Sequence, residues 1–90
     1  MAFPRYLKDP NAVLDYTLDW SLWLNGDTIS TATWTVPMGI TSALETKTTT
    51  VTTIWLSGGT AGTEYTVAVR VVTAGGRTED RSFIISAVSR

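Results

Sequence analysis

Apolar and polar residues alternate along much of this chain with a period of two. The longest such stretch covers 16–24, where every second residue is apolar: Tyr16, Leu18, Trp20, Leu22 and Leu24. Successive side chains of a strand point to opposite faces, so this period predicts a β-strand with one buried face. Tyr16, Trp20 and Trp23 also have helical spacing, but the leucines then form a second, nearly opposite stripe. We therefore predict a strand here.

The same alternation predicts five further strands, separated by turn signals. They cover about 28–36, 40–46, 50–56, 65–73 and 78–88. Asn and Gly at 25–27, Pro37 and the glycines at 74–76 favour turns, because these residues adopt or fix the backbone angles that turns need. Six or seven short strands, with turns about every 8–12 residues and no long helix, are typical of an all-β, antiparallel sandwich.

A glycine-rich loop in LSGGTAGTEYTVAV precedes the strand that begins at Tyr65. In immunoglobulin-like sandwiches a Tyr near the start of the penultimate strand bonds through its hydroxyl to upstream backbone. We predict this tyrosine corner at Tyr65, with Leu56 as the apolar residue upstream. TATWTVP and TAGGRTED resemble the second strand and the last hairpin of fibronectin type III domains. A phosphate-binding loop fits less well, because no Gly-Lys-Ser/Thr follows and a strand comes next.

The first fourteen residues lack a strong strand pattern. We therefore divide the chain into an extended N-terminal arm, 1–14, and an immunoglobulin-like domain, 15–90. Three apolar side chains of the arm are candidate anchors on a partner: Phe3, Tyr6 and Leu7. The sequence DPN at 9–11 fits either a short helical turn capped by Asp9 or an extended segment.

Composition excludes several classes of function. Ninety residues form one domain, and the absence of Cys and His excludes disulfides and the usual zinc ligands. A net charge of −1 provides no basic surface for nucleic acid. The longest apolar run has three residues, too short for a membrane span or a signal peptide. We expect no nucleic-acid or membrane partner, no cofactor, and synthesis in a cytoplasm.

The sequence offers little to a catalytic site. Without His or Cys the common nucleophile–base pairs are absent. Glu79 and Asp80 are adjacent, so in a strand they point to opposite faces, and Arg77 and Arg81 should keep them ionised. Two further aspartates, at 15 and 19, share a face, but calcium needs six to eight oxygen ligands and no Asp-rich loop provides them. We predict no catalytic, cofactor-binding or metal-binding residues.

The four tryptophans divide into two groups by their strand positions. Trp20 and Trp34 fall on inner faces and are assigned to the core. Trp23 and Trp55 fall on outer faces, and an exposed Trp often marks a protein interface. The alternative is a register displaced by one residue, or a covering loop, which would make both of them core residues. Nearby apolar residues at 72 and 84 add to the predicted outer surface.

Three segments together resemble a family of small virion proteins. They are KDPNAVLDYTLDWSLWLNGDTISTATWTV, WLSGGTAGTEYTV and GGRTEDRSF, which together extend over nearly the whole chain. They resemble small structural proteins of tailed bacteriophages, described as fibre–tail adaptor or head–tail-region proteins. This resemblance implies a virion component with an immunoglobulin-like fold that is assembled in the host cytoplasm and is not an enzyme.

The resemblance leaves several functions open. The first is an adaptor that docks tail or neck and fibre components; we expect it to be homo-oligomeric or present in many copies beside other virion proteins. The second is a capsid-decorating protein. A third, from a different class, is a carbohydrate-binding module in which Trp23 and Trp55 stack on sugar rings; a small enzyme comes last.

Overall fold

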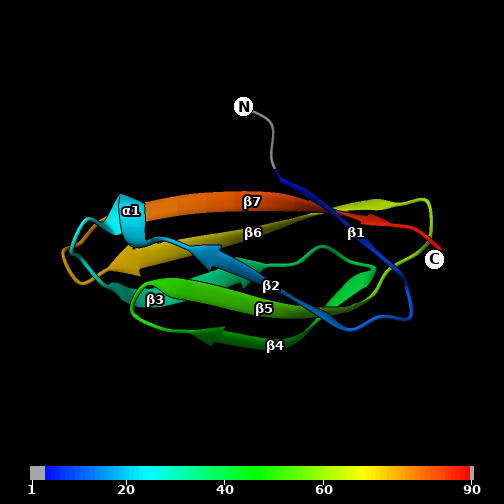
Figure 1. Cartoon of the computed structure of the whole chain (residues 1–90), viewed down its shortest axis with the longest axis horizontal. Helices are drawn as coiled ribbons and strands as arrows, with labels where there is room; N and C mark the ends of the chain where they lie inside the picture. The colour runs from blue at the N-terminus through cyan, green and yellow to red at the C-terminus, as the bar shows by residue number, and fades with distance from the viewer. Residues whose placement is uncertain (1–3, 90) are drawn as a thin grey trace.

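The computed structural model describes residues 4–89, which form seven strands and one short helix (Figure 1). In chain order these elements are β1 (Arg5–Lys8), β2 (Leu14–Asp19), α1 (Ser21–Leu24), β3 (Ile29–Thr35), β4 (Ile40–Lys47), β5 (Val51–Gly58), β6 (Glu64–Thr73) and β7 (Thr78–Ala87). Five of these strands lie close to the ranges that the alternation predicts. The differences lie in the N-terminal part of the chain, where β1 was not predicted and one predicted strand is replaced by β2 and α1.

The strands form two sheets that pack face to face. One has the order β1-β7-β6-β3 and the other the order β2-β5-β4. All neighbours are antiparallel except β1 and β7, which are parallel. The predicted all-β sandwich is confirmed. Trp34 lies on β3, which pairs with β6 in the four-stranded sheet.

The core lies between the two sheets and consists mainly of alternate residues of β5, β6 and β7. Trp20 and Leu56 are fully buried, as predicted, whereas Trp34 is half-buried. The indole Nε1 of Trp20 donates a hydrogen bond of 2.9 Å to Thr52 Oγ1, so its polar edge is satisfied inside the core. Trp34 packs against both halves of the core and contacts Phe83 edge to face, with ring centroids 6.2 Å apart.

The predicted strand over 16–24 is wrong in its second half. β2 ends at Asp19, whose Oδ1 accepts a hydrogen bond of 2.9 Å from the backbone N–H of Ser21 and so starts a turn. The chain then forms the single turn of α1, which ends where Asn25 adopts a left-handed φ of 48°. As a result Leu22, which the alternation places inside, is 96% exposed.

The tyrosine corner is present. Tyr65 is buried, and its hydroxyl accepts a hydrogen bond of 2.9 Å from the backbone N–H of Thr60. Hydrogen bonds from Thr60 lower the pKa of the Tyr65 phenol. A Cβ at Gly39 would lie 3.0 Å from the Tyr65 ring, and Gly39 also has a positive φ of 101°. The ring therefore requires glycine at that position.

Part of the predicted arm belongs to the sandwich. Arg5–Lys8 form β1, which pairs with β7. Tyr6 faces inward, with its ring centroid 5.3 Å from that of Tyr16. The Lys8 side chain is buried and its ammonium donates hydrogen bonds to the carbonyls of Gly58 (2.7 Å) and Asp9 (3.0 Å). Burial lowers the pKa of Lys8 below its ordinary value of 10.5.

Candidate functional site

Trp55 lies at the centre of the most apolar part of the outer face of the β2-β5-β4 sheet. It is 36% exposed, and its direct neighbour on β4, Leu44, is 54% exposed. On its other side the register places Asp15 of β2. We call Trp55 and Leu44 the apolar row. The prediction that Trp55 points outward is thus confirmed by its exposure, whereas a role in binding stays a prediction.

Sequence reasoning missed Leu44 because of a β-bulge. Alternation counted from Ile40 places Leu44 on the inner face, together with Ile40. The register between β4 and β5 shifts between Ser42 and Leu44, and the extra residue moves Leu44 to the outer face. No residue type in this segment indicates a bulge, so the sequence offers no signal for it.

The apolar row ends at an unpaired sheet edge. Among residues 4–89, β4 pairs with β5 on one side only, and no other described strand lies beyond it in Figure 1. β3 is likewise the last strand of its sheet. A hollow of about 180 Å³ is lined by residues of these two edge strands: Ala32, Trp34, Glu45, Thr46 and Lys47. We call the two unpaired edges and this hollow the open flank.

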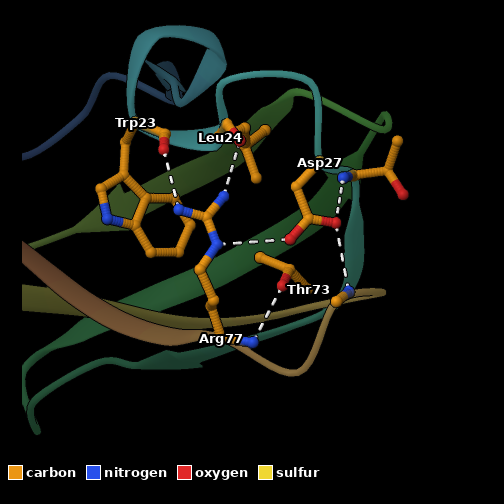
Figure 2. Close-up of polar contacts among 7 residues, drawn as sticks. Trp23, Leu24, Asp27, Thr73 and Arg77 are labelled. Atoms are coloured by element: carbon orange, nitrogen blue, oxygen red, sulfur yellow. Dashed lines mark hydrogen bonds and ion pairs between the residues drawn. The ribbon is translucent and has the colours of Figure 1, made fainter.

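Trp23 does not lie on the outer face of a strand, which corrects its predicted place. It lies on α1 at one end of the molecule, where the Arg77 guanidinium carbon lies 4.4 Å from the centroid of its ring (Figure 2). Trp20 contacts Trp23 edge to face, with centroids 5.7 Å apart. One face of the Trp23 ring is therefore occupied by a cation, and it forms no common sugar-stacking platform with Trp55.

The contacts of Arg77 hold α1 against the β6–β7 hairpin. Its Nη1 and Nη2 donate hydrogen bonds to the carbonyls of Trp23 (3.1 Å) and Leu24 (2.6 Å), at the end of α1 where carbonyls lack helical partners. Its Nε donates to Asp27 Oδ2 at 3.3 Å (Figure 2). Several hydrogen bonds lower the pKa of Asp27, and the one from Thr73 has the largest effect. We call these residues the Arg77 network.

The predicted anchors of the N-terminal arm do not form one surface. Phe3 lies outside the described residues. Tyr6 packs inward between Tyr16 and Phe83, whereas Leu7 points outward and is 52% exposed. Tyr6 still exposes 37% of its surface, so Leu7 is the more exposed of the two described anchors, and a role in binding stays a prediction.

The ionic partner of Asp80 differs from those expected. Asp80 accepts hydrogen bonds of 2.8 and 3.1 Å from Arg70, across the β6–β7 pair. Arg70 lowers the pKa of Asp80, chiefly through these bonds. Arg77 and Arg81 lie elsewhere, and Arg81 stacks on Trp20, with its guanidinium carbon 4.2 Å from the ring centroid.

The part of the chain that the structure describes contains no cluster of side chains that could hold a metal ion. Within 4–89, no group of three or more His, Cys, Asp or Glu side chains converges. A shallow hollow of about 350 Å³ on the outer face of the four-stranded sheet is lined mainly by small hydroxyl residues and by the Arg70–Asp80 pair. Over the same range, no helix has the length and apolar content needed to cross a membrane.

A known protein family matches most of this chain. The model of a family described as podophage GP4 fiber-tail adaptor protein gp77 matches residues 8–86. The matched range begins at the buried Lys8 and includes six of the seven strands entirely or nearly so. A search among curated proteins found no match.

Proposed function

Since the chain belongs to the podophage GP4 fiber-tail adaptor protein gp77 family, we propose that it is a non-enzymatic virion protein that docks tail or neck components to fibre components. The observation that carries this proposal is the family match over 8–86, nearly the whole described chain. Membership of an adaptor family implies contacts with other virion proteins. Assembly in the host cytoplasm and the presence of many copies in each particle are parts of the proposal.

The surface chemistry supports a docking role. The apolar row reaches the β4 edge, which is also part of the open flank between the two sheets. Exposed Trp and Leu side chains are favourable at protein interfaces once water is removed from them. Neither Cys nor His is present in the sequence, which leaves out the nucleophile–base pairs that hydrolases most often use.

We infer further that the sandwich is immunoglobulin-like. Two observations support this inference. The order β3-β6-β7 in one sheet and β2-β5-β4 in the other corresponds to strands C-F-G and B-E-D of that fold. The Tyr65 hydroxyl makes the corner hydrogen bond at the start of the penultimate strand.

The copy number of the chain in purified particles tests the adaptor function. We expect about six or twelve copies, because a closed ring contains as many subunits as its symmetry requires. These copies should remain with the tail when the capsid is removed. Quantitative mass spectrometry with isotope-labelled peptides gives this number. Hundreds of copies on the capsid would instead support the decorating function, and absence from particles would contradict both.

We propose in addition that the arm contributes to docking through Leu7. Deleting residues 1–8 would also remove β1 and the buried Lys8, so that deletion combines two effects. The substitution Leu7→Asp changes only an exposed side chain on the outer face. It should reduce incorporation into particles while leaving the melting temperature unchanged. Normal incorporation of Leu7→Asp would show that Leu7 makes no essential contact.

A further inference from the structure

The unpaired edge of β4 offers backbone groups that recognise an extended chain. β4 is eight residues long, and its backbone pairs with β5 on one side only. A row of free N–H and C=O groups at a sheet edge is satisfied most completely by another strand. Recognition of peptides by strand addition uses these main-chain bonds for affinity and the alternate side chains for specificity.

On the outer face, the apolar row leads directly to this edge. Trp55 pairs with Leu44 on the side of the edge and with Asp15 of β2 on the other side, so the charge lies away from the edge and the apolar row reaches it. A strand added beside β4 would place a side chain next to Leu44, where Leu44 is still 54% exposed. Cross-strand apolar pairs of this kind stabilise sheets, so that side chain should be apolar.

On the inner face, the added strand would direct its alternate side chains toward the hollow of the open flank. Glu45 and Lys47 pair with the buried residues Ile54 and Thr52, so both lie on this inner face. The hollow of about 180 Å³ lies between them and the half-buried Trp34. This volume accommodates one medium-sized apolar side chain. Glu45 and Lys47 flank it, and each of them fits an oppositely charged side chain on the added strand.

The edge is poorly suited to pairing with a second copy of itself. The bulge at Ala43 interrupts β4, and Glu45 is engaged by Ser42, whose hydroxyl donates to Glu45 Oε2 at 2.9 Å. Bulges and charged side chains on edge strands disfavour edge-to-edge association of identical sheets. A separate extended segment, which is not part of a rigid sheet, adapts its twist to a bulged edge more easily than a second folded copy does.

We propose that an extended segment of another virion protein adds as a strand to the free edge of β4, with one apolar side chain beside Leu44 and the next one in the hollow at Trp34. This inference rests on the proposed adaptor function and names the form of one of its contacts. The partner is thus recognised by backbone pairing and by a short apolar pattern.

Site-specific cross-linking tests this contact in assembled particles. Because the chain has no Cys, single-cysteine variants carry one attachment point each. Thr46→Cys places a photo-cross-linker at the β4 edge, and Thr66→Cys places it on exposed β6, in the other sheet. We expect position 46 to yield a cross-linked peptide from another virion protein at about tenfold higher yield than position 66. Equal yields, or cross-links from position 46 only to a second copy of this chain, would overturn the proposal.

A matched pair of substitutions provides an independent measurement. Leu44→Lys and Leu22→Lys each replace an exposed leucine by lysine, at the edge and on α1 respectively. Leu44→Lys should lower incorporation into particles about tenfold, since it puts a charge where the proposed contact is apolar. Leu22→Lys should assemble normally. Equal incorporation of both variants would overturn strand addition at β4, whereas absence of the unmodified chain from particles would instead contradict the adaptor function.

Discussion

At the scale of single residues, two tyrosine hydroxyls in this protein have opposite surroundings. The Tyr65 hydroxyl accepts a hydrogen bond from the backbone of Thr60. The Tyr16 hydroxyl is buried and has no hydrogen-bond partner among the described residues, and burial raises the pKa of its phenol. A buried polar group without a partner costs free energy that a bonded one does not.

The two Tyr→Phe substitutions should therefore change stability in opposite directions. Tyr65→Phe leaves the Thr60 N–H without its acceptor and should lower the melting temperature by about 5 °C in a domain of this size. Tyr16→Phe removes only the unpaired hydroxyl and should leave the melting temperature unchanged or raise it by a few degrees, of the order of 2 °C. Thermal unfolding followed by circular dichroism measures both. Equal losses in the two variants would mean that both hydroxyls are bonded.

At the scale of elements, α1 depends on contacts from outside the helix. A single helical turn of four residues is not stable alone, and its N-cap residue, Trp20, makes no side-chain capping hydrogen bond. The Arg77 network supplies such contacts. Arg77 donates to the carbonyls of Trp23 and Leu24, and Asp27 joins the following loop to Gly75 of the β6–β7 hairpin. Besides the burial of Leu24, the Arg77–Asp27 pair thus contributes to holding this end of the sandwich together.

The lowered pKa of Asp27 gives this end a defined dependence on pH. A carboxyl whose pKa is lower in the folded state stabilises that state above its ordinary pKa, here 3.8, and loses this effect as the pH falls through the folded value. Asp27→Asn should lower the melting temperature by about 5 °C at neutral pH. The difference from the unmodified chain should shrink below about pH 4.

Asp15→Asn, an exposed change on β2, is the control for Asp27→Asn. It should leave the melting temperature at neutral pH nearly unchanged. A constant difference between Asp27→Asn and the unmodified chain from pH 7 to pH 3 would show that the charge of Asp27 contributes nothing to stability.

The elements also show which parts of the fold local sequence determines. The strands from β3 to β7 follow from alternation and turn residues, and the tyrosine corner follows from a glycine-rich loop before Tyr65. α1 could not be predicted, because Trp20, Leu22 and Leu24 continue the alternation of β2. Arg77, which holds α1 in place, lies more than fifty positions further along the chain. The bulge at Ala43 changes the face of Leu44 without any change in composition.

At the scale of the whole molecule, the two flanks of the sandwich differ. One flank is covered where Tyr6 of β1 packs on Tyr16 of β2 and on Phe83. The other is the open flank at β3 and β4. The sequence predicted an exposed Trp55, but it did not predict that β1 pairs with β7, because this contact joins residues nearly eighty positions apart. Pairings between distant segments leave no periodic signal in either of them.

The parallel pairing of β1 and β7 also determines how the molecule responds to force. These are the first and last strands, and they run side by side in the same direction. Tension applied at residues 4 and 89 pulls them in opposite directions along their length, so that their hydrogen bonds are loaded together in shear. Single-molecule pulling should require a higher rupture force through these positions than through residues 11 and 89, which leave β1 outside the load path. Equal rupture forces would contradict this view.

A particle component that joins a fibre to a tail is exposed to thermal and hydrodynamic drag on the fibre each time the particle moves. A strand arrangement that shares tension among several bonds resists such drag better than one that opens bond by bond. The orientation of β1 thus gives this small domain, which has no disulfide, a source of mechanical strength that its equilibrium stability alone would not reveal.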